Sequence, residues 1–143
     1  MQLSPWASVL GLAGLIPFFA GPLGHWLAAT ALPAGWDGYW IGYASLIASF
    51  MAGTQWGLTV PTSGGGWGLL GLLVSVSLML LTWAATALPF DLQILALIGL
   101  FLLLLITDAV RERLIDSLPG YFRLRLLLTS GAVTALAWRA LQG

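Results

Sequence analysis

Cysteine and lysine are absent from this chain of 143 residues, and histidine occurs once. Without cysteine the protein has no disulfide, no thiolate nucleophile and no cysteine-ligated iron–sulfur cluster. With one histidine and two methionines beyond the initiator, side-chain ligands for a soft metal ion are scarce. We therefore expect neither a metal centre nor a cofactor.

Charge is also scarce. Charged residues make up 7% of the chain, with five acidic residues, five arginines and a formal net charge of zero. This is too little polar side chain to coat a water-soluble particle, whereas a bilayer requires no such coat. No basic run could neutralise several phosphates, so we do not expect nucleic acid as a partner. Membrane lipids are the expected surroundings.

What the sequence does contain is five long apolar stretches, at about 4–32, 38–60, 67–88, 91–113 and 121–141. Each is long enough to cross a bilayer, which takes roughly 20 residues. The pattern predicts an all-α, polytopic membrane bundle of five transmembrane helices in a single domain, residues 1–143. The first stretch is interrupted by Pro17 and Pro22, so we expect its helix to be kinked or broken there.

The arginines predict the orientation of the bundle. Four of the five flank the loop between the last two stretches: Arg111, Arg113, Arg123 and Arg125. The positive-inside rule places that loop in the cytoplasm, with the N-terminus inside and the C-terminus outside. Asp37, Asp91 and Arg139 then fall on the outer side. Abundant Ala, Gly and Leu, together with the use of Arg in place of Lys at every basic position, are typical of GC-rich bacteria, so we expect the bacterial cytoplasmic (inner) membrane.

The second stretch is rich in small residues. On a helical wheel, Gly42, Ser49, Gly53 and Gly57 lie on one ridge, and a neighbouring ridge consists of alanines. Small residues allow helices in lipid to approach closely. The ridge therefore packs either within the protein's own bundle or at the seam of a homo-oligomer.

Gln55 lies about one turn from the predicted cytoplasmic end of the second stretch. An amide buried in hydrocarbon must find hydrogen-bond partners. Two alternatives follow: an interhelical hydrogen bond that holds the fold, or a role in binding a ligand or in a water pathway.

Ionisable residues gather at the same predicted end. Asp108, Arg111 and Glu112 share a helical face, and Arg113 with Asp116 forms a second pair of this kind. One interpretation is ordinary ion pairing at the membrane interface. The other is a buried latch between Asp108 and Arg123 or Arg125 beside Gln55. The candidate polar cluster is Gln55, Trp56, Asp108, Arg111, Tyr121, Arg123 and Arg125.

Several spaced motifs resemble those of a family of small membrane proteins that includes transmembrane protein 69 and bacterial relatives, the domain of unknown function 3429. They are Gly53-Thr-Gln-Trp-Gly57, Gly14-Leu-Ile-Pro-Phe18, Asp108 and Leu118-Pro-Gly-Tyr-Phe-Arg-Leu-Arg125. In that family histidine commonly precedes the tryptophan of the first motif, and Gln55 stands there in this chain. The substitution argues against a titrating imidazole and leaves a hydrogen-bonding role possible. The resemblance implies no activity.

Three functions remain open. The first is a non-catalytic interaction or accessory protein that packs against partner helices or lipids, as a homo-oligomer or within a larger membrane complex. The second is permeation or transport of a small solute or ion. The third is binding of a quinone or lipid, or lipid modification. The chain has no nucleophile elbow and no histidine-rich box, so we do not expect an enzyme.

Overall fold

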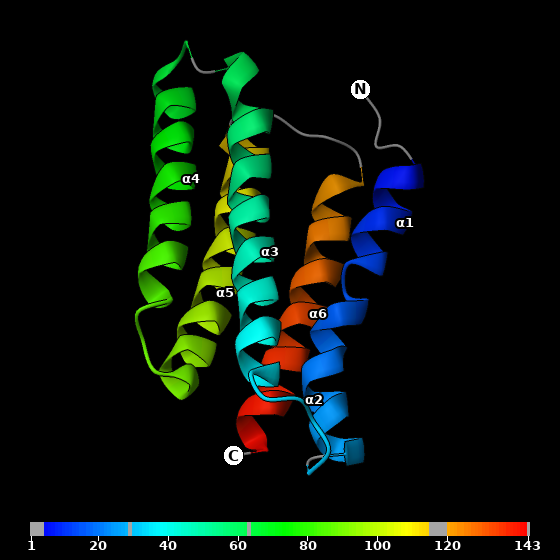
Figure 1. Ribbon diagram of the computed structural model, residues 1–143. Coiled ribbons are helices and arrows are strands. Elements are labelled where there is room, and N and C mark those ends of the chain that lie inside the picture. Colours follow the sequence, from blue (N-terminus) through cyan, green and yellow to red (C-terminus); the bar gives the residue numbers. More distant parts are fainter. Residues whose placement is uncertain (1–4, 29, 63, 115–119, 143) are drawn as a thin grey trace.

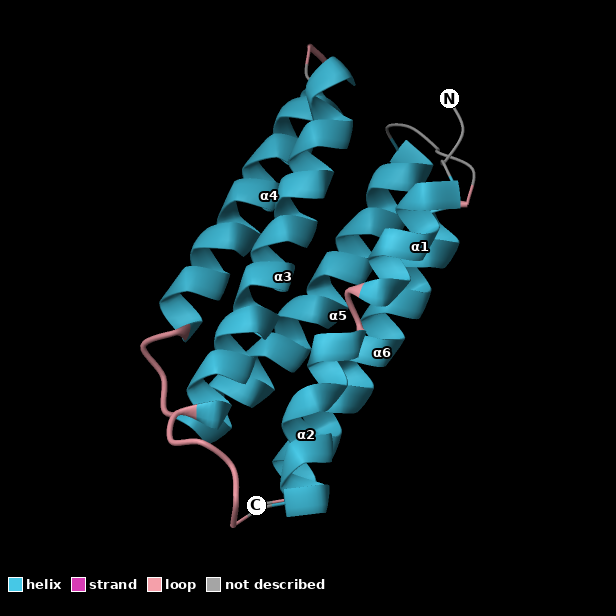
Figure 2. Cartoon of the chain, turned by 45° about the vertical axis from the view of Figure 1, so that its right-hand side comes forward, coloured by secondary structure: helices cyan, strands magenta, loops and turns pink. Residues whose placement is uncertain are grey.

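The computed structural model describes residues 5–28, 30–62, 64–114 and 120–142. These residues form helices and no strand, which confirms the expected all-helical class (Figures 1 and 2). The elements are α1 (Pro5–Ala13), α2 (Ile16–Ala28), α3 (Trp36–Thr59), the short 3-10 helix η1 (Val60–Thr62), α4 (Gly66–Ala85), α5 (Phe90–Leu114) and α6 (Tyr121–Leu141).

The bounds of α3, α4, α5 and α6 follow the predicted stretches closely, and the largest difference is at the end of α4. Helix α6 matches residues 121–141, and α3 and α5 differ from their predicted ranges by one or two residues. Helix α4 ends at Ala85, three residues earlier than predicted. The chain turns through Leu88, whose N–H donates to the carbonyl oxygen of Ala85, because the residue before Pro89 disfavours helical geometry.

The first predicted stretch is two helices. The break falls at Gly14 and Leu15, ahead of Pro17, while Pro22 lies inside α2. Pro17 is the second residue of α2, in a first turn whose N–H groups have no partner within the helix. The prediction of a broken helix is therefore confirmed. The helix is not broken at Pro22, and it ends at Ala28 rather than at residue 32.

Two aromatic side chains of α3 satisfy backbone groups that the interrupted helix leaves unpaired. Pro22 has no N–H to donate to the carbonyl oxygen of Phe18, and the indole Nε1 of Trp40 donates to that oxygen at 2.7 Å. At the break, the hydroxyl of Tyr43 donates to the carbonyl oxygen of Gly14 at 2.6 Å. Within hydrocarbon such carbonyls need a protein partner, so α3 stabilises the broken span.

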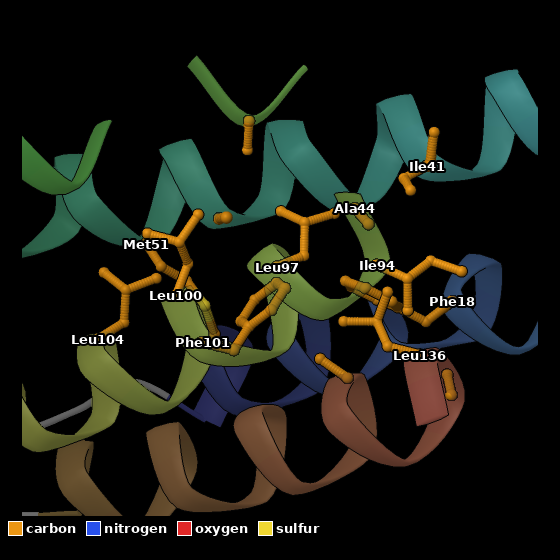
Figure 3. Close-up of a cluster of buried hydrophobic side chains, with 14 of the residues drawn as sticks. Phe18, Ile41, Ala44, Met51, Ile94, Leu97, Leu100, Phe101, Leu104 and Leu136 are labelled. Atoms are coloured by element: carbon orange, nitrogen blue, oxygen red, sulfur yellow. The ribbon is translucent and has the colours of Figure 1, made fainter. Parts of the chain in front are cut away.

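The hydrophobic core contains residues from α2, α3, α4, α5 and α6 (Figure 3). The ring of Phe18 packs edge-on against Phe101 and Tyr43, with ring centroids 5.7 and 5.5 Å apart. Ala44 and Ala48 are fully buried, and their small size lets α3 lie close to its neighbours. The core thus joins the broken first span to the four long helices.

Four segments of the described chain are long and apolar enough to cross a membrane: Pro5–Ala28, which joins α1 and α2, and helices α4, α5 and α6. Helix α3 is long enough but falls short in apolarity. It carries Asp37 and Gln55 together with several Ser, Thr and Gly residues. The expectation of five apolar spans therefore holds for four of them.

The helices run alternately up and down, so each end of the bundle gathers a defined set of residues (Figure 1). Helices α3 and α5 end, and α1, α4 and α6 begin, at one end, which we call the arginine end because Arg111 and Arg125 lie there. At the opposite end, which we call the Asp37 end, α3 and α5 begin and α2, α4 and α6 end.

Candidate functional site

The centre of the candidate site is an ion pair between α5 and α6. Nε of Arg125 lies 2.6 Å from Oδ2 of Asp108, and both side chains are almost completely buried. A buried charge of either sign is costly without its counter-ion, so each group stabilises the other. Of the two arginines predicted as partners of Asp108, Arg125 rather than Arg123 forms the ion pair.

Tyr121 and Arg111 extend this pair into a cluster. The ring of Tyr121 contacts both guanidinium groups, with the Cζ atoms of Arg111 and Arg125 each 5.6 Å from its centroid. The Tyr121 hydroxyl is buried and has no hydrogen-bond partner among the described residues, as is also true of Nε and Nη2 of Arg111. The cluster therefore places two buried guanidinium groups against one buried carboxylate.

Gln55 links α3 to the same region of α5. Its Nε2 donates to the carbonyl oxygen of Leu104 at 2.9 Å and to Oγ1 of Thr107 at 2.7 Å, and the side chain lies beside Asp108. Of the two alternatives for this amide, the interhelical hydrogen bond is present. We call Gln55, Asp108, Arg111, Tyr121 and Arg125 the ionic cluster.

Two residues of the predicted cluster lie outside it. Arg123 is exposed, because on a helix two residues of spacing turn a side chain roughly 200° away from Arg125. Trp56 is 43% exposed, since it directly follows Gln55 and so lies about 100° around α3. The structure also exposes Arg113, whose predicted partner Asp116 lies outside the described residues.

The glycines of the α3 ridge do not closely contact the other described helices of the bundle, although the first of the two interpretations required such contact. A Cβ atom added at Gly42, Gly53 or Gly57 would meet nothing within 4 Å, so no other described element contacts these positions closely. Ser49 on the same ridge is half-buried. The neighbouring alanine ridge makes the contacts within the bundle. Packing of the glycines against the protein's own helices is therefore wrong for the described chain.

Next to the ionic cluster lies a cavity of about 590 Å³, bounded by α1, α2, α3 and α6. We call it the lateral groove. It exists because α1 packs against α6, while α3 packs mainly against α2, α4 and α5. Most of its lining is apolar, with Leu10 and Phe50 at its exposed sides. Tyr121 and Arg125 line it at the arginine end.

A second ionic group, at the Asp37 end, was not among the predicted site residues. Arg139 donates two hydrogen bonds to the Asp37 carboxylate, from Nε at 3.1 Å and from Nη2 at 2.8 Å, and Nε2 of His25 lies 2.8 Å from Oδ1. The hydrogen bonds from Arg139 are the main reason why the pKa of Asp37 is lowered. Burial acts in the opposite direction, and the contact with His25 lowers the pKa further. In the sequence, only the predicted position of Asp37 and Arg139 on the same side of the membrane indicated that they could pair.

Fold and site together define a multi-pass helical membrane protein with a buried ionic cluster and a groove at one end. The chain belongs to the family described as "Protein of unknown function (DUF3429)", whose model matches residues 3–141. This confirms the family suggested by the motifs, while the link to transmembrane protein 69 stays a prediction. No curated protein and no solved structure matches the chain.

Proposed function

We propose that this protein is a non-catalytic membrane protein that binds the hydrocarbon chain of a lipid in the lateral groove. The observation that carries the proposal is the groove itself: a cavity of about 590 Å³ with a mainly apolar lining and polar side chains at one end. Binding sites for small molecules are commonly 300–1,000 Å³ in volume and combine an apolar lining with a few polar groups.

The position of the groove also favours a lipid. Its exposed residues, Leu10 and Phe50, are large and apolar, as are the exposed Val9 on α1 and Leu46 on α3, so its mouth would open sideways into the bilayer. A lipid chain would enter without crossing water. Of the first predicted function, packing against partner helices or lipids, this proposal keeps the interaction with lipids. Of the third, it keeps lipid binding and not lipid modification.

The proposal includes five spans in the bacterial inner membrane, with α3 as the fifth. Helix α3 has 24 residues and is about 36 Å long, enough to cross a hydrocarbon core of about 30 Å. It runs beside α4 and α5 along their length (Figures 1 and 2). Neighbouring helices cover Gln55 and Ser45, so their polarity does not face lipid. The positive-inside rule would place the arginine end in the cytoplasm.

Lipid capture is tested by native mass spectrometry of the protein released from mild detergent. We expect the wild type to retain lipid. Thr54→Trp, which places an indole in the groove, should reduce the lipid-bound fraction about tenfold. Leu46→Trp is the matched control, because Leu46 is exposed on the same helix and does not line the groove. Equal lipid retention by both variants would contradict the proposal.

A second candidate function, packing against a partner helix, is favoured by the open glycine ridge of α3. Gly53 and Gly57 are exposed and have no close neighbour, and such spacing suits close helix contact in lipid. The same spectra test this candidate. A partner polypeptide or a homodimer that Gly53→Leu removes and Gly99→Leu leaves intact would support it, and a monomer carrying only lipid would reject it.

Permeation has less support. Two polar side chains of α4 point in different directions: Ser77 is exposed and donates to the carbonyl oxygen of Leu73 in its own helix, whereas Ser75 is buried on another face of α4. These positions do not line one passage.

A further inference from the structure

We propose that the lateral groove selects a phospholipid with a net anionic head group, and that Tyr121 and Arg125 bind its phosphate. The inference rests on the proposed function and adds the chemistry of the ligand. The juxtaposition that carries it is a long apolar groove ending at a buried cluster whose positive charge exceeds its negative charge.

The groove ends beside buried positive charge. Arg111 and Arg125 are each more than nine-tenths buried, and Asp108 is the acidic side chain between them. No acidic residue lines the described part of the groove. Buried positive charge without an equal counter-charge attracts an anion strongly, because the surroundings screen it little. An anionic oxygen at this end of the groove would supply that counter-charge.

Two side chains at this end of the groove have hydrogen-bond donors to spare. The Tyr121 hydroxyl is buried without a partner among the described residues, on a side chain that lines the groove. Nε of Arg125 pairs with Asp108, and among the described residues Nη1 and Nη2 reach only the carbonyl oxygen of Met51, both at 3.5 Å. Those two distances are at the limit of a hydrogen bond, so the outer nitrogens have N–H groups to spare. A phosphate accepts such donors well.

The length of the groove matches the depth of one leaflet of the membrane. Tyr121 and Arg125 belong to the first turns of α6, where a span meets the head groups. The lining residues of α6 extend from Tyr121 to Ala132, a rise of about 16 Å. That length is about half of the 30 Å hydrocarbon core, which is the depth of one leaflet. The groove therefore suits an acyl chain whose head lies at the arginine end.

The net charge of the head distinguishes two kinds of phospholipid. A zwitterionic head also carries a phosphate, but it would bring an ammonium group close to Arg111 and Arg125, where like charges repel. An anionic head brings no such group. Basic pockets between transmembrane helices on the cytoplasmic side bind anionic lipids in other membrane proteins.

The experiment is a lipid titration of the purified protein in detergent, followed by native mass spectrometry. The probes are phosphatidylglycerol, phosphatidylethanolamine and phosphatidylcholine with identical acyl chains, together with glycerol phosphate, which has no acyl chain. We expect phosphatidylglycerol to bind about tenfold more tightly than either zwitterionic lipid. Glycerol phosphate should not compete, because it leaves the apolar groove empty.

Tyr121→Phe should weaken phosphatidylglycerol binding several-fold and leave phosphatidylcholine binding unchanged. Tyr39→Phe is the matched control, because Tyr39 is 84% exposed at the Asp37 end. Should Tyr121→Phe fail to fold, Arg125→Lys keeps the charge and tests the spare nitrogens in its place. Equal affinity for all three lipids, abolished by Thr54→Trp, would overturn the anionic preference and leave lipid binding standing. Absence of any lipid binding would overturn both.

Discussion

Among single side chains, Asp108 has the largest predicted effect on stability. It is buried at the contact of α5 and α6 and pairs with Arg125. Asp108→Asn would leave the Arg125 guanidinium buried without its counter-ion, so we expect a loss of about 3–5 kcal/mol in the free energy of unfolding. Thermal unfolding of the purified protein in detergent measures this loss.

The matched control for that change is Arg123→Gln. Arg123 is exposed two residues before Arg125, so its loss should change stability by no more than about 0.5 kcal/mol. The pairing also predicts that Asp108→Asn combined with Arg125→Gln destabilises less than the two single changes together. Wild-type unfolding of Asp108→Asn would show that the ion pair contributes nothing.

Asp37 predicts a dependence of stability on pH. Hydrogen bonds from Arg139 hold the pKa of Asp37 below its ordinary value in the folded protein. The stabilisation from this group is therefore fully present above the ordinary, unfolded-state pKa and is lost as the pH falls through the lowered, folded-state pKa. We expect the unfolding temperature to decline between about pH 5 and about pH 3.

The measurement compares the wild type with Asp37→Asn across that range. The variant should be less stable than the wild type near neutral pH, and the difference should shrink at the acidic end, because an amide cannot titrate. Glu112→Gln serves as a control at the opposite end of the bundle. Parallel pH profiles of the wild type and Asp37→Asn would exclude this role.

Where α2 contacts α3, the space beside Gly21 is too small for a larger side chain. A Cβ atom added at Gly21 would lie 2.5 Å from Cδ2 of Trp40, whose indole is buried and hydrogen-bonded to Phe18. The ring cannot move without breaking that bond. Gly21→Ala should therefore destabilise the protein by about 1–3 kcal/mol, as measured by unfolding in detergent.

Gly99→Ala is the control for that prediction. Gly99 also lies inside a long helix, but a Cβ atom there would meet nothing within 4 Å. Alanine favours a helix over glycine by up to about 1 kcal/mol, so this variant should be as stable as the wild type or more stable. If both variants behaved alike, the close approach of α2 to Trp40 would not limit stability.

For the bundle as a unit, the testable property is its orientation. An odd number of spans places the termini on opposite sides, and the arginine end is predicted to be cytoplasmic. A phosphatase reporter fused after Gly143 should therefore be active outside the cytoplasm, while a fluorescent reporter there should stay dark. The opposite pattern would mean an even number of spans, with α3 failing to cross, or an inverted bundle.

Much of the architecture could be predicted from the sequence, because its signals are local. Apolar length set the range of α6 and nearly those of α3 and α5, and the prolines predicted that the first span would break. Helical spacing also placed Asp108 and Arg111 on one face, where both are buried. The position of the break could not be predicted from such local signals, because it depends on the carbonyl oxygens to which Trp40 and Tyr43 donate hydrogen bonds.

Partners that are distant in the chain required the fold. Asp37 and Arg139 are 102 residues apart, and the choice of Arg125 over Arg123 as the partner of Asp108 depends on the rotation of α6 about its axis. The lateral groove depends on the distance between α3 and the pair of α1 and α6, a property of helix packing that no local pattern encodes. Hydropathy thus identifies four segments that can cross a membrane, because the apolarity of a segment depends only on its own residues. The cluster and the groove, in contrast, exist only where several helices meet.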